Sequence, residues 1–127
     1  MIEVKNLSKQ FKAPTEEKGL FGPKKKAFWA VKDLDFEIKK GSVASILGPN
    51  GCGKTTTLRM IAGMLTPSKG TVFVDSVDVR KDKQTVKSKI GYMTNNTSLY
   101  DRLNVIETVK FFAELNQIPA DVYMPRA

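Results

Sequence analysis

Hydrophobic and polar positions alternate in two segments of the chain, with the period of a half-buried β-strand. Residues 34–39 (LDFEIK) alternate along their whole length, and residues 2–4 form a shorter segment of the same kind. Residues 43–47 (VASIL) are apolar or small at every position, which predicts a short strand that is buried on both faces. Residues 12–27 are rich in Lys, Gly, Pro and Glu, and they predict a surface loop or a long hairpin connection.

Two other segments have the pattern of an amphipathic helix. From Lys54 onwards, apolar residues recur at i, i+3, i+4 and i+7 and predict one buried helix face, followed by a turn over residues 66–70. The residues of this face are Leu58, Ile61, Ala62 and Leu65. A last helix is predicted over residues 104–116, because Asn104 and Glu107 have the spacing of a capping box.

Shorter elements are predicted between the two helices. Residues 71–75 favour a strand, with which residues 77–79 pair back. Residues 81–88 are polar and predict a loop or a short helix, and residues 90–93 favour another strand. Residues 94–103 then form a polar connection.

The composition is that of a soluble globular domain, with 127 residues, 41% hydrophobic and 27% charged. No apolar run approaches the ~18 residues that span a bilayer, and the start lacks the apolar centre of a signal peptide, so we expect a cytoplasmic protein. The single cysteine excludes an internal disulfide, and the lack of histidine removes the commonest general base. A net charge of +8 favours nucleotide phosphates, nucleic acid or an anionic membrane as partners.

One stretch selects among these partners, because it satisfies the phosphate-loop pattern G-x-x-x-x-G-K-[ST] between a predicted strand and a predicted helix. Its backbone N–H groups and the positive end of the helix suit a diphosphate. Lys54 suits the β- and γ-phosphates, Thr55 suits Mg²⁺, and a Gly-rich turn without a ligand is the alternative. The predicted phosphate-binding residues are Gly48, Pro49, Asn50, Gly51, Cys52, Gly53, Lys54, Thr55 and Thr56.

The same loop, ILGPNGCGKTT in this sequence, resembles the Walker A segment of the ATPase subunits of ABC transporters. Three further stretches resemble this family in order and spacing: VKNLSKQF (4–11), AVKDLDFEIKKG (30–41) and GMLTPSKGTV (63–72). The resemblance extends to about Gln117 and implies an α/β fold, a P-loop NTPase core with an antiparallel β layer that binds ATP and Mg²⁺. Residues 91–115 look most like subunits of sodium-export or drug-export systems.

The resemblance also implies roles for single residues outside the loop. Phe11 matches the aromatic residue that stacks on adenine, and Phe28 and Trp29 are its rivals because a long insertion blurs the alignment. Val31 would touch the adenine or the ribose, with core packing as the alternative. Asn95 stands where the family has a glutamine that helps hold Mg²⁺ and position water, with a turn contact as the alternative. Asn95 would share the metal with Thr55.

Two further features admit a functional and a structural interpretation. Asp75 ends the apolar run VFVD, as does the Mg²⁺-holding aspartate of P-loop ATPases, but Ser76 rather than glutamate follows, so an antiparallel hairpin is preferred. The run KKK at residues 24–26 is read as a solvated charge run, with contact to anionic lipid as the alternative. Nucleic acid is not predicted as a partner, because no basic helix stripe is interleaved with aromatic residues.

Motifs of the family's C-terminal half are absent from the sequence. There is no LSGGQ-like signature, no apolar run that ends in Asp-Glu, and no histidine, so the catalytic carboxylate and the switch histidine are missing. The chain is therefore identified as the N-terminal half of such a domain, truncated before the signature and Walker B motifs. Residues 1–94 would form a partial nucleotide-binding core, and residues 95–127 a Q-loop-like connection and the first helix of the helical subdomain.

The resemblance implies the ATP-binding subunit of a membrane exporter, in which ATP binding and hydrolysis drive transport. The implied partners are a transmembrane permease and a second ATPase subunit in a head-to-tail dimer, and the permease would hold the protein at the inner face of the cell membrane. We expect the chain alone to be inactive as an ATPase. A non-catalytic truncated or split nucleotide-binding module, and a P-loop enzyme of another family such as a small kinase, stay open as alternatives.

Overall fold

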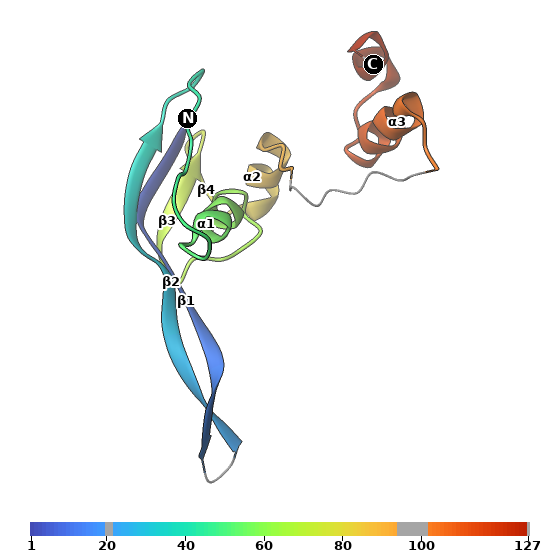
Figure 1. The fold of residues 1–127 in the computed structure, drawn as a ribbon. Coiled ribbons are helices and arrows are strands. Elements are labelled where there is room, and N and C mark those ends of the chain that lie inside the picture. Colours follow the sequence, from blue (N-terminus) through green and yellow to red (C-terminus); the bar gives the residue numbers. More distant parts are fainter. Residues whose placement is uncertain (20–21, 94–101, 127) are drawn as a thin grey trace. The chain divides into compact units, whose positions relative to one another are not determined.

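The chain forms two compact units, Met1–Tyr92 and Met93–Ala127 (Figure 1). The computed structural model describes residues 1–19, 22–93 and 102–126, and each unit is described by itself. The functional division predicted at residue 94 stays a prediction. The first unit contains β1 (Ile2–Gly19), β2 (Gly22–Ile38), α1 (Lys54–Ile61), β3 (Lys69–Val74), β4 (Val77–Asp78) and α2 (Lys83–Lys89).

The strands of the first unit form an antiparallel sheet in the order β2-β1-β3-β4, as the predicted antiparallel layer requires. β1 and β2 make a long hairpin, whose pairing continues to Gly19↔Gly22. The prediction of a strand limited to residues 2–4 is therefore wrong in extent, and residues 12–19 and 22–27 belong to a long hairpin, the alternative to a surface loop. This part of β1 pairs only with β2 among the described strands, so its sequence needs no apolar face and has the composition of a loop.

The hairpin contains a β-bulge at Ala30. Lys9 pairs with Val31 and Gln10 pairs with Trp29, so Ala30 is an extra residue on β2. A bulge bends its strand and takes a backbone group out of the regular ladder. The backbone oxygen of Ala30 lies against the turn that begins α1.

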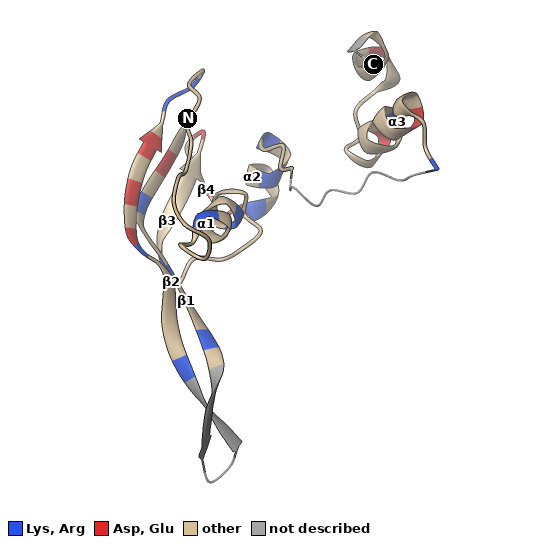
Figure 2. Ribbon diagram, in the orientation of Figure 1, with Lys and Arg blue, Asp and Glu red and all other residues tan. Residues whose placement is uncertain are grey.

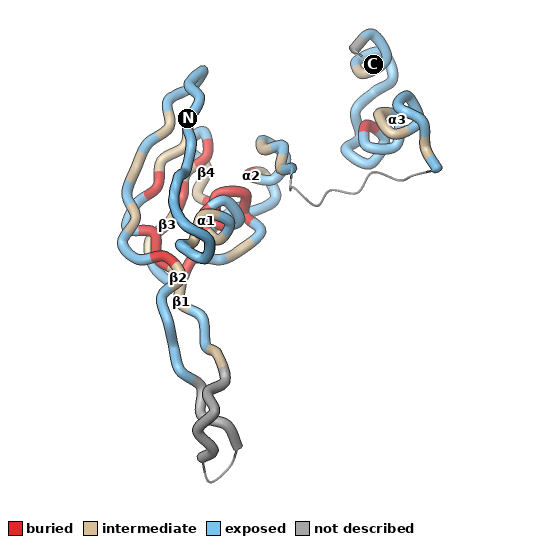
Figure 3. Tube along the Cα trace, in the orientation of Figure 1, coloured by how far each residue is buried: buried red, intermediate tan, exposed pale blue. Residues whose placement is uncertain are grey.

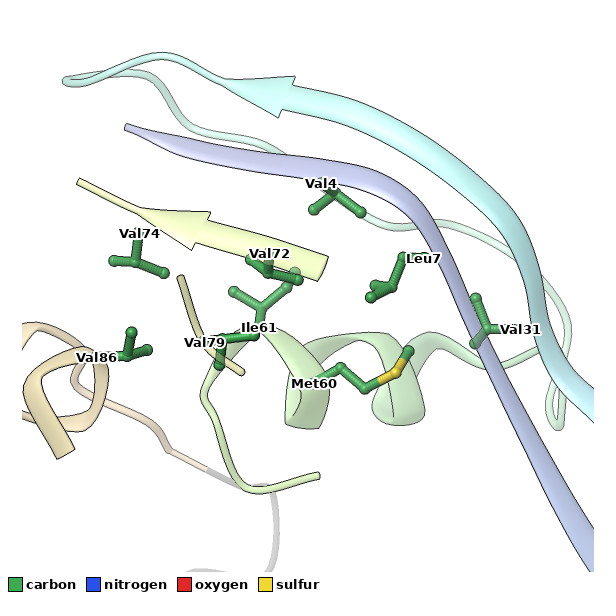
Figure 4. Close-up of a cluster of buried hydrophobic side chains, with 9 residues drawn as sticks. All are labelled: Val4, Leu7, Val31, Met60, Ile61, Val72, Val74, Val79 and Val86. Carbon is green, nitrogen blue, oxygen red and sulfur yellow. The ribbon is translucent and has the colours of Figure 1, made fainter. Parts of the chain in front are cut away.

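The core of the first unit lies between one face of the sheet and helix α1, where the buried residues gather in Figure 3. Each buried aliphatic side chain of this kind contributes about 1.5–3 kcal/mol to folding. The packing fixes α1 on the sheet and thereby fixes the loop that precedes it. Figure 4 shows the nine side chains of this core: Val4, Leu7, Val31, Met60, Ile61, Val72, Val74, Val79 and Val86.

Helix α1 buries a face that is rotated from the predicted one. Thr57, Met60 and Ile61, at i, i+3 and i+4, are its buried residues. The assignment of Leu58 to the buried face is wrong, because this side chain is 44% exposed. The helix ends at Ile61, well before the predicted turn, so Leu65 lies beyond it and is only half-buried.

Two predicted strands are not formed in the described part of the chain. Residues 43–47 have no strand partner there, and Val43 and Leu47 are 97% and 90% exposed. An apolar segment becomes a buried strand only where neighbouring strands take up its backbone groups and cover both faces. Ile46 and Leu47 instead line an open groove beside Leu34 of β2. Residues 90–93 are likewise irregular, and residues 94–101 lie outside the described residues.

The segment after β3 follows the prediction. β3 and β4 form the expected antiparallel hairpin, with Val74 opposite Val77. The alternative of a short helix in the next segment is confirmed by α2, whose N-cap is Asp82. The Asp82 carboxylate accepts hydrogen bonds from the N–H and the hydroxyl of Thr85, and these bonds hold the pKa of Asp82 below its ordinary value.

The second unit contains α3 (Val105–Leu115), α4 (Ala120–Tyr123) and the 3-10 turn η1 (Met124–Arg126). The predicted capping box is confirmed: Asn104 Oδ1 accepts from the N–H of Glu107 at 2.9 Å, and Glu107 Oε2 accepts from the N–H of Asn104 at 2.8 Å. α4 was not predicted. No helix among the described residues is both long and apolar enough to cross a bilayer.

Candidate phosphate-binding site

The loop before α1 takes backbone conformations that glycine adopts readily. Gly51 and Gly53 have φ values of +82° and +97°, which L-residues rarely adopt. The N–H of Cys52 donates to the oxygen of Pro49 at 3.4 Å and closes the turn. Glycine at positions 51 and 53 therefore has a structural reason, because the backbone there is left-handed.

The first turn of α1 leaves its backbone donors without a side-chain cap. Gly53 is the N-cap and has no side chain, and the first turn contains no acidic residue. The N–H of Thr57 makes the first helical bond, to Gly53 O at 2.8 Å. The hydroxyls of Thr55 and Thr56 make no hydrogen bond with another described residue. An uncapped helix start with free N–H groups and hydroxyls is an arrangement that binds anions.

Lys54 folds back over the loop that it follows. Its Nζ donates to Gly48 O at 2.6 Å and to Pro49 O at 2.7 Å, and it lies 3.8 Å from the exposed Cys52 Sγ. The ammonium group is thus held within the loop by neutral acceptors, and no described carboxylate pairs with it. A phosphate group in the loop would compete for these same donors with a full negative charge.

The loop lies close to strand β2 at Gly53, where a larger residue would not fit. A Cβ at position 53 would overlap the backbone oxygen of Ala30 and would come within 3.0 Å of Val31 Cγ2. The predicted role of Val31 toward adenine or ribose is untested; Val31 is 8% exposed and belongs to the core. Sequence reasoning missed Ala30, whose only signal is Gly53, the second glycine of the pattern, which marks a close backbone approach.

The aromatic residues near the base of the hairpin form two separate contacts. Phe11 and Phe28 pair across the hairpin with ring centroids 6.0 Å apart, and Lys9 Nζ lies 5.2 Å from the Phe11 ring. Trp29 instead lies under Lys69 Nζ at 5.4 Å. Phe11 is 36% exposed, so part of its ring is accessible while the rest packs on Phe28. The choice of Phe11 as the adenine-stacking residue stays a prediction.

Two other predicted residues lie outside the loop. Asn95 falls outside the described residues, so its predicted contact with Mg²⁺ stays a prediction. Asp75 lies in the β3–β4 turn, where its Oδ1 accepts from the amino terminus of Met1 at 2.7 Å. This hydrogen bond and charge lower the pKa of Asp75. Its place in the turn agrees with the preferred hairpin interpretation.

Comparison with known families identifies the fold and the loop together. The model of the ABC transporter family matches residues 31–126, which include the whole phosphate loop. The chain belongs to the ABC transporter family. The alternative of a P-loop enzyme from another family, such as a small kinase, is therefore wrong.

Curated ABC relatives agree with this assignment. The ABC transporter ATP-binding protein NatA of Bacillus subtilis is 47% identical over 75% of this chain and 39% of its own length. The probable multidrug ABC transporter ATP-binding protein YbhF of Escherichia coli is 33% identical over 89% of this chain and 17% of its own length. The chain thus spans well under half of these relatives.

A solved ABC cassette has the same fold. The cassette MJ0796, in a dimeric post-hydrolysis state bound to ADP and Pi, is 27% identical with a TM-score of 0.71. The match covers 91% of this chain and 48% of the cassette. The expectation of a P-loop NTPase core with an antiparallel layer is confirmed for the part of the ABC cassette that this chain represents.

Gly53→Ala should destabilise the first unit more than Gly41→Ala. Both positions have positive φ, at +97° and +78°, but a Cβ at position 41 meets nothing within 4 Å. Gly41→Ala adds only backbone strain of about 1–2 kcal/mol, whereas Gly53→Ala also displaces the loop from Ala30. Denaturant unfolding of both variants measures the difference. Equal destabilisation would contradict the role assigned to the contact between Gly53 and Ala30.

Proposed function

We propose that this chain is the nucleotide-binding part of the ATP-binding subunit of an ABC membrane transporter, and that residues 48–56 bind ATP with Mg²⁺. The observation that carries the proposal is the glycine turn that leads into an uncapped helix start. The family assignment selects the nucleotide, because NatA and YbhF are both named ATP-binding proteins.

Each group of the loop has a separate task in this proposal. The N–H groups of the first turn of α1 surround the phosphates, and Lys54 exchanges the oxygens of Gly48 and Pro49 for phosphate oxygens. Thr55 supplies a hydroxyl for Mg²⁺, and Thr56 supplies a further donor. The metal neutralises the phosphate charge when bound. The loop fits such a group because its hydroxyls are not used by other described residues.

Three roles outside the loop belong to the proposal in finer detail. Phe11, whose side chain is partly exposed beside Phe28 and Lys9, stacks on adenine, and Val31 touches the adenine or the ribose. Asn95 takes the position of the glutamine that holds Mg²⁺ and positions water. These assignments rest on the family resemblance of the segments in which the residues lie.

Hydrolysis needs groups beyond the phosphate loop. A P-loop ATPase must polarise the attacking water and neutralise the charge that develops at the γ-phosphate. The sequence has no histidine, no Asp-Glu after an apolar run and no LSGGQ-like signature. We therefore propose that these 127 residues alone bind ATP without turnover, and that the remaining catalytic groups lie outside them. A non-catalytic nucleotide-binding module remains the alternative function.

The partners follow from the role of a transporter subunit. We propose a second ATPase subunit in a head-to-tail dimer, as the dimeric state of the MJ0796 cassette supports, and a transmembrane permease that holds the subunit at the inner face of the membrane. Export is the finer proposal, which the multidrug relative YbhF supports. The Fe(3+) ions import ATP-binding protein FbpC of Vibrio cholerae is 31% identical, so import by the same scaffold is the competing direction.

Lys54→Ala should weaken the binding of Mg-ATP to the purified chain by about 1.5–3 kcal/mol, because it removes a charged hydrogen-bond donor to phosphate. Isothermal titration calorimetry measures the change, and Lys32→Ala, at an exposed lysine of β2, is the control with the same change in charge. Thermal unfolding of both variants tests whether the fold is kept. Equal ATP affinity in wild type and Lys54→Ala would refute the proposed site.

Phosphate release by the purified chain should stay at the level of a no-enzyme blank, although ATP binds. A coupled phosphate assay at saturating ATP measures the release, with Lys54→Ala in parallel to reveal a contaminating ATPase. Steady turnover that is lost in Lys54→Ala would show that these 127 residues contain a complete catalytic site. That outcome would contradict the proposed need for groups outside these residues.

A further inference from the structure

The net positive charge of the chain comes from its first unit. Residues 1–92 carry 18 basic and 9 acidic side chains, whereas residues 93–127 carry 3 basic and 4 acidic side chains. The phosphate loop uses one of these cations, Lys54. The proposed binding of ATP therefore leaves most of the excess positive charge without a role.

Part of the excess is concentrated on and beside α2, where basic residues follow closely on one another in Figure 2. Residues 80–89 (RKDKQTVKSK) contain five basic residues and one acidic residue. The acidic residue, Asp82, is engaged as the N-cap of α2 through Thr85. It forms no ion pair with a lysine of this segment.

Four exposed cations of this segment form what we call the basic surface: Arg80, Lys81, Lys83 and Lys87. Arg80 Nη1 donates to Gly70 O at 3.2 Å, and Lys83 Nζ donates to Thr66 Oγ1 at 2.7 Å. These acceptors are neutral, so the bonds hold the side chains without cancelling their charges. None of the four forms an ion pair with a described residue, whereas Lys89 lies 4.0 Å from Asp75 Oδ2 and is left out of the surface.

The two lysines of the basic surface that lie on α2 are unfavourable for this helix. Lys83 and Lys87 are four residues apart, so two like charges lie on the same side of α2. Lys83 also lies in the first turn, where a positive charge opposes the helix dipole and where the N-cap carboxylate of Asp82 is the acidic group that offsets it. A side chain arrangement that costs local stability is an indication of a binding role.

A shallow hollow of about 500 Å³ adjoins this surface on the outer side of the sheet. Arg80 and Lys81 line it together with Thr71 and Asp78. The Asp78 carboxylate is already bonded to the Thr71 hydroxyl and the Arg80 N–H, and Lys5, at the rim, is paired with Glu3 at 2.8 Å. The Asp78 carboxylate offsets one of the two cations, so the hollow, which has room for a phosphate headgroup, keeps one net positive charge.

The chemistry of the surface favours a lipid partner over a protein or a nucleic acid. Val86 is the one aliphatic residue of α2 and it is buried, so the surface offers no apolar centre for a protein interface. Three of the four cations are lysines, which give positive charge without the fork-like geometry that arginine uses to recognise phosphates of nucleic acid. A fluid anionic surface requires only such charge.

We propose that the basic surface docks the first unit onto the anionic headgroups of a membrane by electrostatic attraction, without insertion into the bilayer. The inference rests on the proposed function only in that a transporter subunit works beside a membrane. The run KKK at residues 24–26, for which anionic lipid was the alternative interpretation, is a separate segment. Docking through α2 would hold the unit close to the bilayer independently of the permease.

Co-flotation of the purified chain with lipid vesicles, in the absence of nucleotide, tests the inference. The chain should bind vesicles of phosphatidylglycerol and phosphatidylcholine at low salt and dissociate from them at high salt. It should not bind vesicles of phosphatidylcholine alone. The triple variant Lys81→Gln, Lys83→Gln, Lys87→Gln should bind on the order of 100-fold more weakly. The same three positions changed to Arg should keep the affinity.

A matched control removes the same charge elsewhere, through Lys32→Gln, Lys39→Gln and Lys40→Gln at exposed positions of β2 and the turn after it. This control should change the affinity for anionic vesicles far less than the triple variant of Lys81, Lys83 and Lys87. Lys87→Glu is a milder test at a side chain without contacts, and it should weaken binding roughly 30-fold.

Three outcomes would each overturn the inference. The two charge-removing triple variants lose affinity for anionic vesicles equally, or only substitution of residues 24–26 weakens the binding. The third outcome is equal binding of the chain to neutral vesicles. Failure to bind anionic vesicles at all would overturn it as well. Because nucleotide is absent from the assay, these outcomes leave the ATP site untouched, and calorimetry of Lys54→Ala tests that site separately.

Discussion

The approach of Gly53 to the backbone oxygen of Ala30 is the constraint on which the phosphate loop depends. At the bulge, Ala30 of β2 has no residue opposite it on β1. Gly53, which has no Cβ, lets the start of α1 approach the backbone oxygen of Ala30. The core between α1 and the sheet then holds the helix in that place. The sheet, the bulge, Gly53 and the helix thus fix the orientation of the N–H groups that we propose bind phosphate.

Positive charge at the loop adds to the effect of this backbone arrangement. The helix start has no acidic residue and no side-chain cap, so its donors and the Lys54 ammonium together present positive charge to the loop. The wider surface of the same unit is also basic, while the second unit is slightly acidic. The groups that we propose for contact with phosphate and with lipid headgroups lie in the more basic first unit.

Local sequence signals predicted those elements that local interactions decide. The capping box of α3 depends on two residues three positions apart, and the β3–β4 hairpin depends on a short turn, so both could be read from neighbouring residues. The phosphate loop was recognisable because its glycines, lysine and threonines act within nine residues of one another. The Ala30 contact was not recognisable, because the bulge is a property of the register between two strands.

The wrong predictions concern residues whose structure depends on distant partners. Residues 43–47 have the composition of a buried strand, but no described strand pairs with them, and the same segment is exposed. The far part of the β1–β2 hairpin has the composition of a loop, yet mutual pairing alone makes it a strand. Composition reports the environment that a segment suits, whereas hydrogen-bonding partners decide the conformation that it takes.

The most direct test of the account is amide nuclear magnetic resonance of the chain during titration with Mg-ATP, with pyrophosphate and adenosine as separate ligands. If residues 48–56 bind the phosphates, the N–H signals of Gly51, Gly53, Lys54 and Thr55 should shift with ATP and with pyrophosphate, and should not shift with adenosine. Shifts confined to residues 80–89, or no shift in the loop with either phosphate ligand, would contradict the assignment of this loop as the nucleotide site.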